Sequence, residues 1–273
     1  MPFYLFIQFF FFHPIIFKNK KGFFMKKIIG FLLLFHSVLL CGESLKETAH
    51  ALFLNQRYQE AIQYYTEALK QNPKLAEGYL YRGISYHELG LFKEALSDYQ
   101  KTLELEKNNL EALLYRGILY QATGEYQKSE ADLSRVIETK PTHAEAYFYL
   151  GKTHFFLEKF DLAVKSYSKA IFLNPRAEIY FYRGIAYTSS KDYEKALKDY
   201  FTVLEIDENY FFAYYNLACV YSLKKEQEKA CFFFRQAVKT GVLEWNEIEK
   251  DTDLENFRES FCYQQVMKQY KGK

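Results

Sequence analysis

Small and aromatic side chains recur along the chain at spacings that predict pairs of amphipathic helices. Tyr79, Gly83 and Tyr86 stand at i, i+4 and i+7, which places them on one face of a helix. Gly90 follows where that helix should end, and Ala95 and Tyr99 then mark the inner face of a second helix. The small side chains would let the two backbones approach closely, with the tyrosines filling the flanks.

This helix pair recurs six times between residues 42 and 241. A glycine or alanine returns in steps of 34 residues, apart from one step of 33. These small residues are Ala49, Gly83, Gly117, Gly151, Gly184 and Ala218. A period of this length indicates a solenoid of stacked helix pairs. We number each repeat so that this small residue is position 8.

The repeat is seen most clearly in AYFYLGKTHFFLEKFDLAVKSYSKAIFLNP, residues 146–175, and it resembles the tetratricopeptide repeat family. The resemblance implies an all-α fold, a right-handed α-solenoid of six helix-turn-helix units, and a role in binding other proteins. After Gly241 the period stops, and residues 242–273 resemble the tail that often caps such arrays.

Arginine at position 7 and aspartate at position 23 occur in the same three repeats. The other three repeats have neither residue at these positions. This joint change predicts an ion pair between the two helices of one repeat, because an arginine at a partly buried helix interface needs a partner. The predicted pairs are Arg82–Asp98, Arg116–Asp132 and Arg183–Asp199.

Apolar residues at positions 5 and 9 predict a binding groove. The resemblance implies that positions 2, 5, 9, 12 and 13 line the groove of the family, and here an apolar ladder fills two of them. The predicted groove residues are Leu80, Ile84, Leu114, Ile118, Phe148, Phe181 and Ile185. Such a groove favours a hydrophobic peptide or helix as partner. The alternative is that neighbouring repeats bury part of this ladder.

The first 41 residues are strongly apolar and predict export. A charged start at Met25, an apolar run and the small, polar CGES are typical of a signal peptide over residues 25–41. VLLC resembles the lipobox of bacterial lipoproteins, which predicts lipidation at Cys41 and a membrane-anchored envelope protein. Residues 1–24 are interpreted as a translated leader before the true start. Plain secretion and an N-terminal transmembrane anchor are the alternatives.

Charge and motif content argue against several classes of function. The net charge is +2, and because residues 1–41 hold five lysines and no acid, the remainder is slightly acidic. We therefore expect no nucleic-acid partner. No nucleophile, phosphate-binding or metal-ligand motif is found, so neither an enzyme nor a cofactor or metal is expected. The four cysteines form no CxxC, although Cys219 and Cys231 lie on the two helices of one repeat and could pair.

The sequence thus predicts a non-catalytic adaptor of the bacterial cell envelope, tethered through its N-terminus and binding a protein or peptide. A self-associating structural protein and an accessory subunit of an envelope enzyme or export complex are the alternatives. Glutamates at position 2, among them Glu111, Glu145 and Glu178, have two interpretations. They complement the dipoles of their helices, or they form an acidic lattice for cations.

Overall fold

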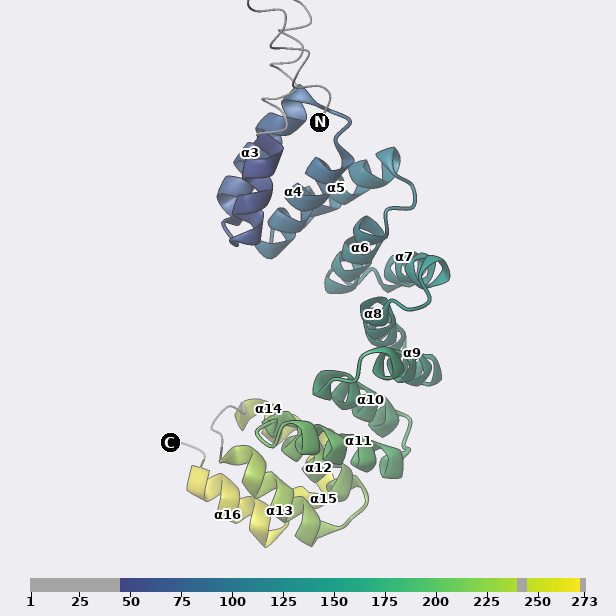
Figure 1. The fold of residues 1–273 in the computed structure, drawn as a ribbon. Coiled ribbons are helices and arrows are strands. Elements are labelled where there is room, and N and C mark those ends of the chain that lie inside the picture. Colours follow the sequence, from purple (N-terminus) through teal and green to yellow (C-terminus); the bar gives the residue numbers. More distant parts are fainter. Residues whose placement is uncertain (1–44, 240–244, 271–273) are drawn as a thin grey trace, which may run out of the picture. The chain divides into compact units, whose positions relative to one another are not determined.

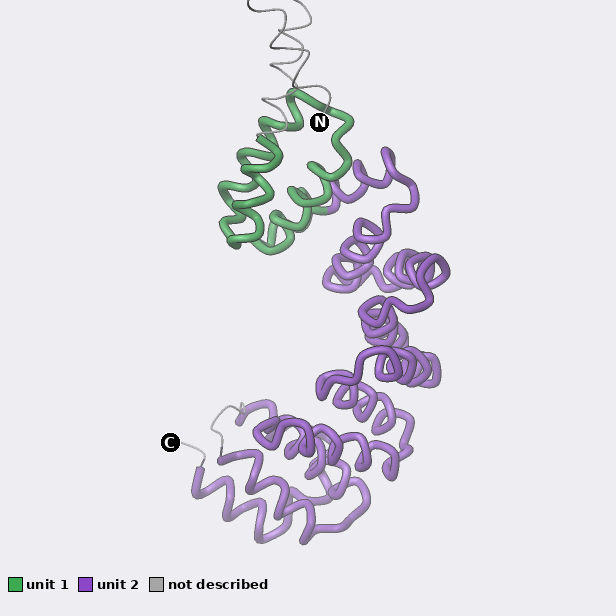
Figure 2. The backbone as a smooth tube through the Cα atoms, in the orientation of Figure 1, with its two compact units in different colours: residues 1–95 green, residues 96–273 purple. Residues whose placement is uncertain are grey.

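A computed structural model describes residues 45–239 and 245–270. These residues form two compact units, one ending at Ala95 and the other, here unit 2, beginning at Leu96 (Figure 2). Each unit is described by itself. Cys41 and the predicted signal peptide lie outside the described residues. Within the described residues, no helix is both long and apolar enough to cross a membrane.

The described chain is all-α, as the period of the sequence predicts (Figure 1). A helix over residues 45–54 opens the first unit. It is followed by α3 (Tyr58–Gln71), α4 (Ala76–Glu88) and α5 (Phe92–Leu105), and the boundary between the units falls within α5. Unit 2 continues with α6 (Leu110–Ala122), α7 (Tyr126–Thr139), α8 (Ala144–Phe156), α9 (Phe160–Leu173), α10 (Ala177–Ser189), α11 (Tyr193–Ile206), α12 (Phe211–Leu223) and α13 (Gln227–Val238).

In unit 2 the first helix of each repeat packs on the second: α6 on α7, α8 on α9, α10 on α11 and α12 on α13. The glycine at position 8 makes this approach possible. A Cβ added at Gly151 would lie 2.6 Å from the ring of Tyr167, and one at Gly184 would lie 2.6 Å from the ring of Tyr200. Both rings are buried at position 24, so the small residue and the aromatic residue form one interlocking contact.

A residue with left-handed backbone ends the first helix of every repeat at position 15. Glycine occupies this position in two repeats, where Gly90 and Gly124 have φ of 73° and 80°. Glutamine, glutamate or lysine occupies it in the others, where φ lies between 57° and 64°. The four non-glycine residues are Gln56, Glu158, Lys191 and Lys225. In each case the next N–H bonds back to the carbonyl five residues earlier, as Lys159 does to His154, which satisfies an exposed helix end.

Short helices follow the last repeat and cover its end. They are α14 (Trp245–Lys250), the 3-10 turn η1 (Thr252–Leu254), α15 (Glu255–Arg258) and α16 (Phe261–Tyr270). Phe257 and Tyr263 are buried against Phe234 of α13, with ring centroids 5.6 and 5.4 Å from that ring. The segment therefore closes the hydrophobic core that the last repeat would otherwise expose.

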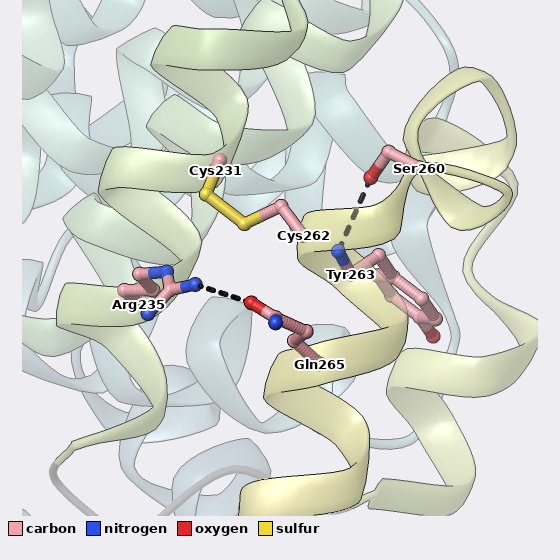
Figure 3. The surroundings of a disulfide bond; sticks show 6 residues. All are labelled: Cys231, Arg235, Ser260, Cys262, Tyr263 and Gln265. Atoms are coloured by element: carbon pink, nitrogen blue, oxygen red, sulfur yellow. Dashed lines mark hydrogen bonds between the residues drawn. A yellow bond between two sulfur atoms is a disulfide. The ribbon is translucent and has the colours of Figure 1, made fainter.

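A disulfide bond joins this segment to the last repeat (Figure 3). Cys231 on α13 pairs with Cys262 on α16, with the Cα atoms 5.9 Å apart, and Arg235 donates to Gln265 beside it at 3.3 Å. The expectation that Cys231 could pair with Cys219 is therefore wrong. Cys219 is a buried free thiol, because its position 9 on α12 faces the capping segment rather than α13.

Candidate functional site

The first helices of successive repeats form one continuous surface in unit 2. α6 contacts α8, α8 contacts α10, and α10 contacts α12. Among the described helices of unit 2, no comparable contact joins α7 to α9 or α9 to α11. We call the surface formed by α6, α8, α10 and α12 the inner face. It is the surface on which the predicted groove residues of unit 2 stand.

Position 5 of this ladder is core, which corrects part of the predicted groove. Leu114, Phe148 and Phe181 are buried, as are Leu80 at position 5 and Ile84 at position 9 in the first unit. The reason is stacking between repeats. Phe148 meets Tyr182 of the next repeat edge-on at 5.6 Å, and Phe181 lies 5.1 Å from Tyr210. Side chains this deep cannot contact a partner, so the predicted alternative of burial by neighbouring repeats holds at these five positions.

On α6, α8 and α10, position 9 is the accessible part of the ladder, whereas Ile84 and Cys219 at the same position of their repeats are buried. Ile118 and Ile185 are half-buried, and Lys152 stands at the same position between them. Position 6 is also half-buried, and there Tyr149 and Tyr182 flank the lysine. The inner face therefore presents aliphatic and tyrosine side chains around one central cation.

Lys152 is surrounded by aromatic rings. Its Nζ lies 4.9 Å from the ring centroid of Tyr182, 5.6 Å from that of Phe148 and 5.7 Å from that of Tyr149. Burial lowers the pKa of the ammonium group, and the charge of Glu178 offsets part of this effect. No carboxylate of the described residues lies within salt-bridge distance of Lys152. The cation is thus partly desolvated, and its direct contacts are with aromatic rings rather than with a carboxylate.

The glutamates at position 2 stand at the edge of the inner face. Glu111, Glu145 and Glu178 each occupy the first turn of their helix, where a negative charge complements the dipole. Among the residues that the structure describes, no group of three or more His, Cys, Asp or Glu could hold a metal ion.

Two of the predicted ion pairs are brought together in unit 2. Arg116 donates to Asp132 through Nε and Nη2 at 2.7 and 2.8 Å, and Arg183 meets Asp199 in the same way at 2.8 and 2.7 Å. Each pair joins the two helices of one repeat. Arg183 also donates to Ser168 of the preceding repeat at 2.9 Å. The arginine therefore has a structural role.

The third predicted pair cannot be described in this way, because Arg82 and Asp98 belong to different units. Arg82 does donate to Thr66 of the preceding repeat at 3.1 Å, as Arg183 does to Ser168. Both hydroxyls stand at position 25, and this link between repeats was not predicted from the sequence. The sequence carries no clear signal for it, because Gln100 stands at position 25 before Arg116 and Ser134 stands there before Leu150.

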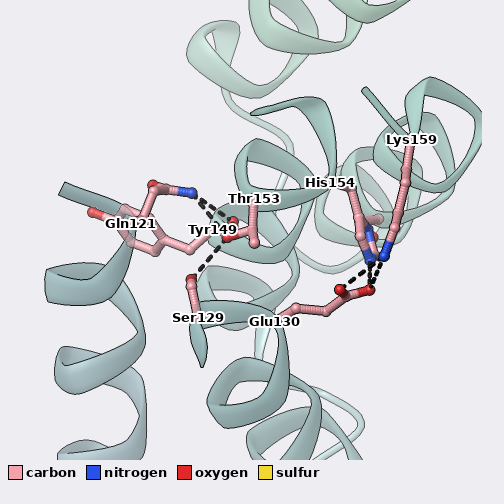
Figure 4. A network of polar contacts seen from close by, with 8 residues as sticks. Gln121, Ser129, Glu130, Tyr149, Thr153, His154 and Lys159 are labelled. Atoms are coloured by element: carbon pink, nitrogen blue, oxygen red, sulfur yellow. Dashed lines mark hydrogen bonds and ion pairs between the residues drawn. The ribbon is translucent and has the colours of Figure 1, made fainter. Parts of the chain in front are cut away.

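Polar contacts replace the ion pair in the repeat formed by α8 and α9 (Figure 4). His154 shares hydrogen bonds with Ser166 at 3.2 Å and with Glu130 at 3.2 Å, and Glu130 also pairs with Lys159. Burial lowers the pKa of His154, and the charge of Glu130 offsets part of the shift. These contacts join α7 to the following repeat and are structural.

A second group in the same region is fully internal. Gln121 donates to Thr153 at 2.9 Å, and Thr153 shares a hydrogen bond with Ser129 at 2.9 Å (Figure 4). Because all three side chains are buried and bonded, they add specificity to the stacking of α6, α7 and α8.

The capping segment occupies the inner face of the last repeat. Tyr215 at position 5 of α12 donates to Asp251 at 2.5 Å, and the thiol of Cys219 at position 9 lies 3.8 Å from the same carboxylate. Leu254 and Phe257 are buried beside them in the same core. The surface that remains open to a partner in unit 2 is therefore that of α6, α8 and α10.

Comparisons with known proteins agree with the repeat pattern. Profiles described as "Tetratricopeptide repeat" or "TPR repeat" match residues 49–90, 76–109, 111–143, 144–176, 177–210 and 213–240. Together these ranges cover well over half of the chain.

Curated relatives match a short part of the chain. Hsp70-Hsp90 organizing protein 1 from Glycine max and that from Arabidopsis thaliana are each 43% identical over 49 residues, which is 18% of this chain. The match spans 9% of the length of each relative.

Solved structures share the fold. MamA from Desulfovibrio magneticus RS-1 has a TM-score of 0.59 at 20% identity, over 62% of this chain and 96% of that one. PilF from Pseudomonas aeruginosa has a TM-score of 0.64 at 13% identity, over 85% and 99%. YrrB, titled a TPR protein with an unusual peptide-binding site, has a TM-score of 0.57 at 21% identity, over 75% and 97%.

Proposed function

Because the chain belongs to the tetratricopeptide repeat family, we propose that it is a scaffold of the bacterial cell envelope that binds a partner peptide or helix along the inner face of unit 2. The proposal contains no catalytic step. The family and its solved relatives support a protein-interaction scaffold. The position of the site and the compartment are the parts proposed here.

The state of Lys152 is the observation that carries the proposed site. A half-buried ammonium with no carboxylate partner has lost part of its hydration without gaining an ion pair. Such a group is stabilised when a ligand supplies an acceptor. It lies between Ile118 and Ile185, which offer apolar surface on either side. A bound segment that combines apolar side chains with an acceptor would satisfy all three residues.

Variants at the accessible positions test this site. The double substitution Ile118→Ser with Ile185→Ser should remove partner binding and leave the melting temperature nearly unchanged, because both side chains are half-buried rather than core. Phe172→Ser is the matched control, since this α9 side chain is 79% exposed and away from the inner face. Quantitative co-purification of the partner with each variant would distinguish them. Equal capture by all variants would show that the partner docks elsewhere.

Two observations support export. Residues 25–41 resemble a signal peptide that ends at Cys41, and the Cys231–Cys262 bond is of a kind that persists in oxidising compartments. Cys41→Ala should release the protein from membranes or leave its precursor unprocessed. Unchanged membrane association with an N-terminus at Met1 would support a transmembrane anchor in place of lipidation.

Self-association is the second candidate function, and exposed phenylalanines favour it. Phe172, Phe232 and Phe261 are 79%, 57% and 75% exposed. Apolar side chains this exposed could join copies of the chain. Sedimentation of the purified protein would decide between the two. A monomer at micromolar concentration supports the adaptor, and a dimer lost in Phe232→Ser supports the self-associating protein.

A further inference from the structure

A basic pocket lies next to the inner face. It is a cavity of about 290 Å³ between the turn that precedes α8 and the turn that precedes α10. Its polar lining residues are Lys140, Thr142, His143, Glu145, Asn174 and Arg176. Five of these six side chains carry hydrogen-bond donors, Lys140 and Arg176 can only donate, and Glu145 is the acidic member.

The two permanent cations of the pocket have no carboxylate partner. Neither Lys140 nor Arg176 forms an ion pair within the described residues. Some other lysines of unit 2 are neutralised locally: Lys128 pairs with Glu125, and Lys159 pairs with Glu130. Lys140 and Arg176 therefore bring two positive charges to one cavity, against the single negative charge of Glu145.

The histidine of the pocket is held as a donor. The backbone N–H of Ala146 donates to Nδ1 of His143 at 3.3 Å, so the proton of the neutral ring is carried on Nε2. The remaining nitrogen of the ring is thus an N–H donor. With the ammonium and the guanidinium, this gives three donor groups of three different side-chain types around one cavity.

A single aromatic ring connects the pocket to the inner face. Arg176 lies 5.7 Å from the ring centroid of Phe148, and Lys152 lies 5.6 Å from the same centroid. The ring of Phe148 is therefore near both Lys152 on the inner face and Arg176 in the pocket, so a ligand that contacts Lys152 lies close to the pocket. Lys140 and Arg176 stand in the turns between repeats and not on the first helices that form the inner face.

We propose that this pocket binds the side-chain carboxylate of an acidic residue in the partner peptide, held by Lys140, Arg176 and the Nε2–H of His143. The inference rests on the proposed function, because it assumes a peptide on the inner face, and it adds the chemistry of that peptide. Charge-assisted hydrogen bonds from an arginine and a lysine are the strong ones for such a group. The partner segment is then apolar where it meets Ile118 and Ile185, and acidic where it passes Phe148.

Binding of a defined acidic peptide tests the pocket. The full chain, purified in detergent, would be titrated calorimetrically with acetyl-hexaglutamate amide, with acetyl-hexaglutamine amide as the neutral comparison. Lys140→Ala with Arg176→Ala should weaken hexaglutamate binding by about tenfold or more, because two charge-assisted contacts are lost. Lys165→Ala with Lys198→Ala is the matched control. It removes the same charge from exposed positions on α9 and α11 and should change affinity by less than about twofold.

The chemical shifts of the His143 ring provide a second test that does not depend on the binding affinity. The ring resonances of His143 should shift on addition of hexaglutamate and stay unchanged with hexaglutamine. Equal weakening by the two double variants, or no shift at His143, would overturn the proposal and indicate diffuse attraction.

Two further probes separate the sources of an oxyanion. A His143 shift with inorganic phosphate but none with hexaglutamate would overturn the assignment to a peptide carboxylate. Loss of binding to phosphatidylglycerol vesicles in the pocket variant, with no effect on the peptide, would overturn it in favour of a membrane surface. Partner capture that depends on Ile118 and Ile185 but ignores Lys140 and Arg176 would remove the pocket and leave the proposed function intact.

Discussion

Gly151 of α8 lies directly under the ring of Tyr167 of α9, so that a Cβ on the glycine would be 2.6 Å from two carbon atoms of the ring. The ring is fixed, since only 1% of Tyr167 is exposed. Gly184 stands in the same relation to Tyr200. At Gly151 and Gly184 the small residue that defines the repeat period is therefore matched to the aromatic residue sixteen positions later, whose ring packs where a Cβ would stand.

We expect Gly151→Ala to destabilise the protein by about 1–3 kcal/mol, since the added methyl group overpacks a closed contact. Gly78→Ala is the control. A Cβ there would lie 3.0 Å from a terminal carbon of Leu75 and 3.1 Å from one of Leu69, and both are ends of flexible side chains that can move. Because alanine is more favourable than glycine inside a helix by about 1 kcal/mol, Gly78→Ala should leave the stability unchanged or raise it. Urea unfolding of both variants would measure the difference, and equal stabilities would contradict the contact.

The Arg183–Asp199 pair should be strongly coupled. The side chain of Asp199 is 4% exposed and that of Arg183 is 18% exposed, so removal of the arginine leaves a buried carboxylate without its partner. Arg183→Leu should therefore cost on the order of 1–4 kcal/mol. The double variant Arg183→Leu with Asp199→Ser has the residue types of Leu150 and Ser166 and should recover part of that loss. A double-mutant cycle with no coupling here and at Arg116–Asp132 would contradict the structural role.

His154 should make stability depend on pH. Its pKa in the folded protein is lowered, chiefly by burial, so the unfolded chain takes up the proton first as pH falls. The contribution of His154 to the free energy of unfolding is complete above about pH 6.5, the pKa of histidine in an unfolded chain. It declines as the pH falls from there toward the lower pKa of the folded protein. His154→Tyr places here the residue that Tyr120 and Tyr187 supply in other repeats. Between about pH 7.5 and 5.5, the variant His154→Tyr should lose less free energy of unfolding than the unaltered protein, by up to about 1 kcal/mol.

Urea unfolding at the two pH values measures this effect. His143→Gln is the matched control and should keep the full pH dependence, because that ring lies outside the buried contacts of His154. An unchanged slope in His154→Tyr would show that the histidine does not contribute.

The Cys231–Cys262 bond should stabilise the capping segment. It closes a loop with a sequence separation of 31 residues, for which loop entropy predicts about 3–4 kcal/mol. Reduction should therefore speed hydrogen exchange in α16 and deprotect the core around Phe257. The double variant Cys231→Ser with Cys262→Ser should behave as the reduced protein does and should not respond to the reductant. Equal exchange in oxidised and reduced protein would contradict a stabilising bond.

The repeat itself was predictable because its information is local. The spacing of Gly117 and Gly151 predicts the period, and joint substitution at positions 7 and 23 predicts which residues meet. The left-handed backbone at Lys191 was not predictable in this way, since only glycine signals that conformation by its identity. The geometry is imposed there by the repeat, against the preference of the residue.

Burial along the inner face was harder to predict. Each first helix carries two apolar stripes, and the sequence does not reveal which one the next repeat covers. Leu114 and Ile118 are both apolar and four residues apart, yet the first is buried and the second is half-exposed. Stacking between repeats decides this, and it is a non-local property. The pairing of Cys231 with Cys262 was hard to predict for the same reason, because Cys262 lies outside the periodic part of the chain.

Site-specific photocrosslinking in growing cells tests the central claim most directly. A benzophenone side chain would be placed at Ile185 on the inner face and, in a separate variant, at Phe172 on α9, which is exposed on the other side of the helix pair. The account predicts a discrete adduct with another protein from Ile185 and none from Phe172. An adduct from Phe172 with none from Ile185 would contradict binding at the inner face.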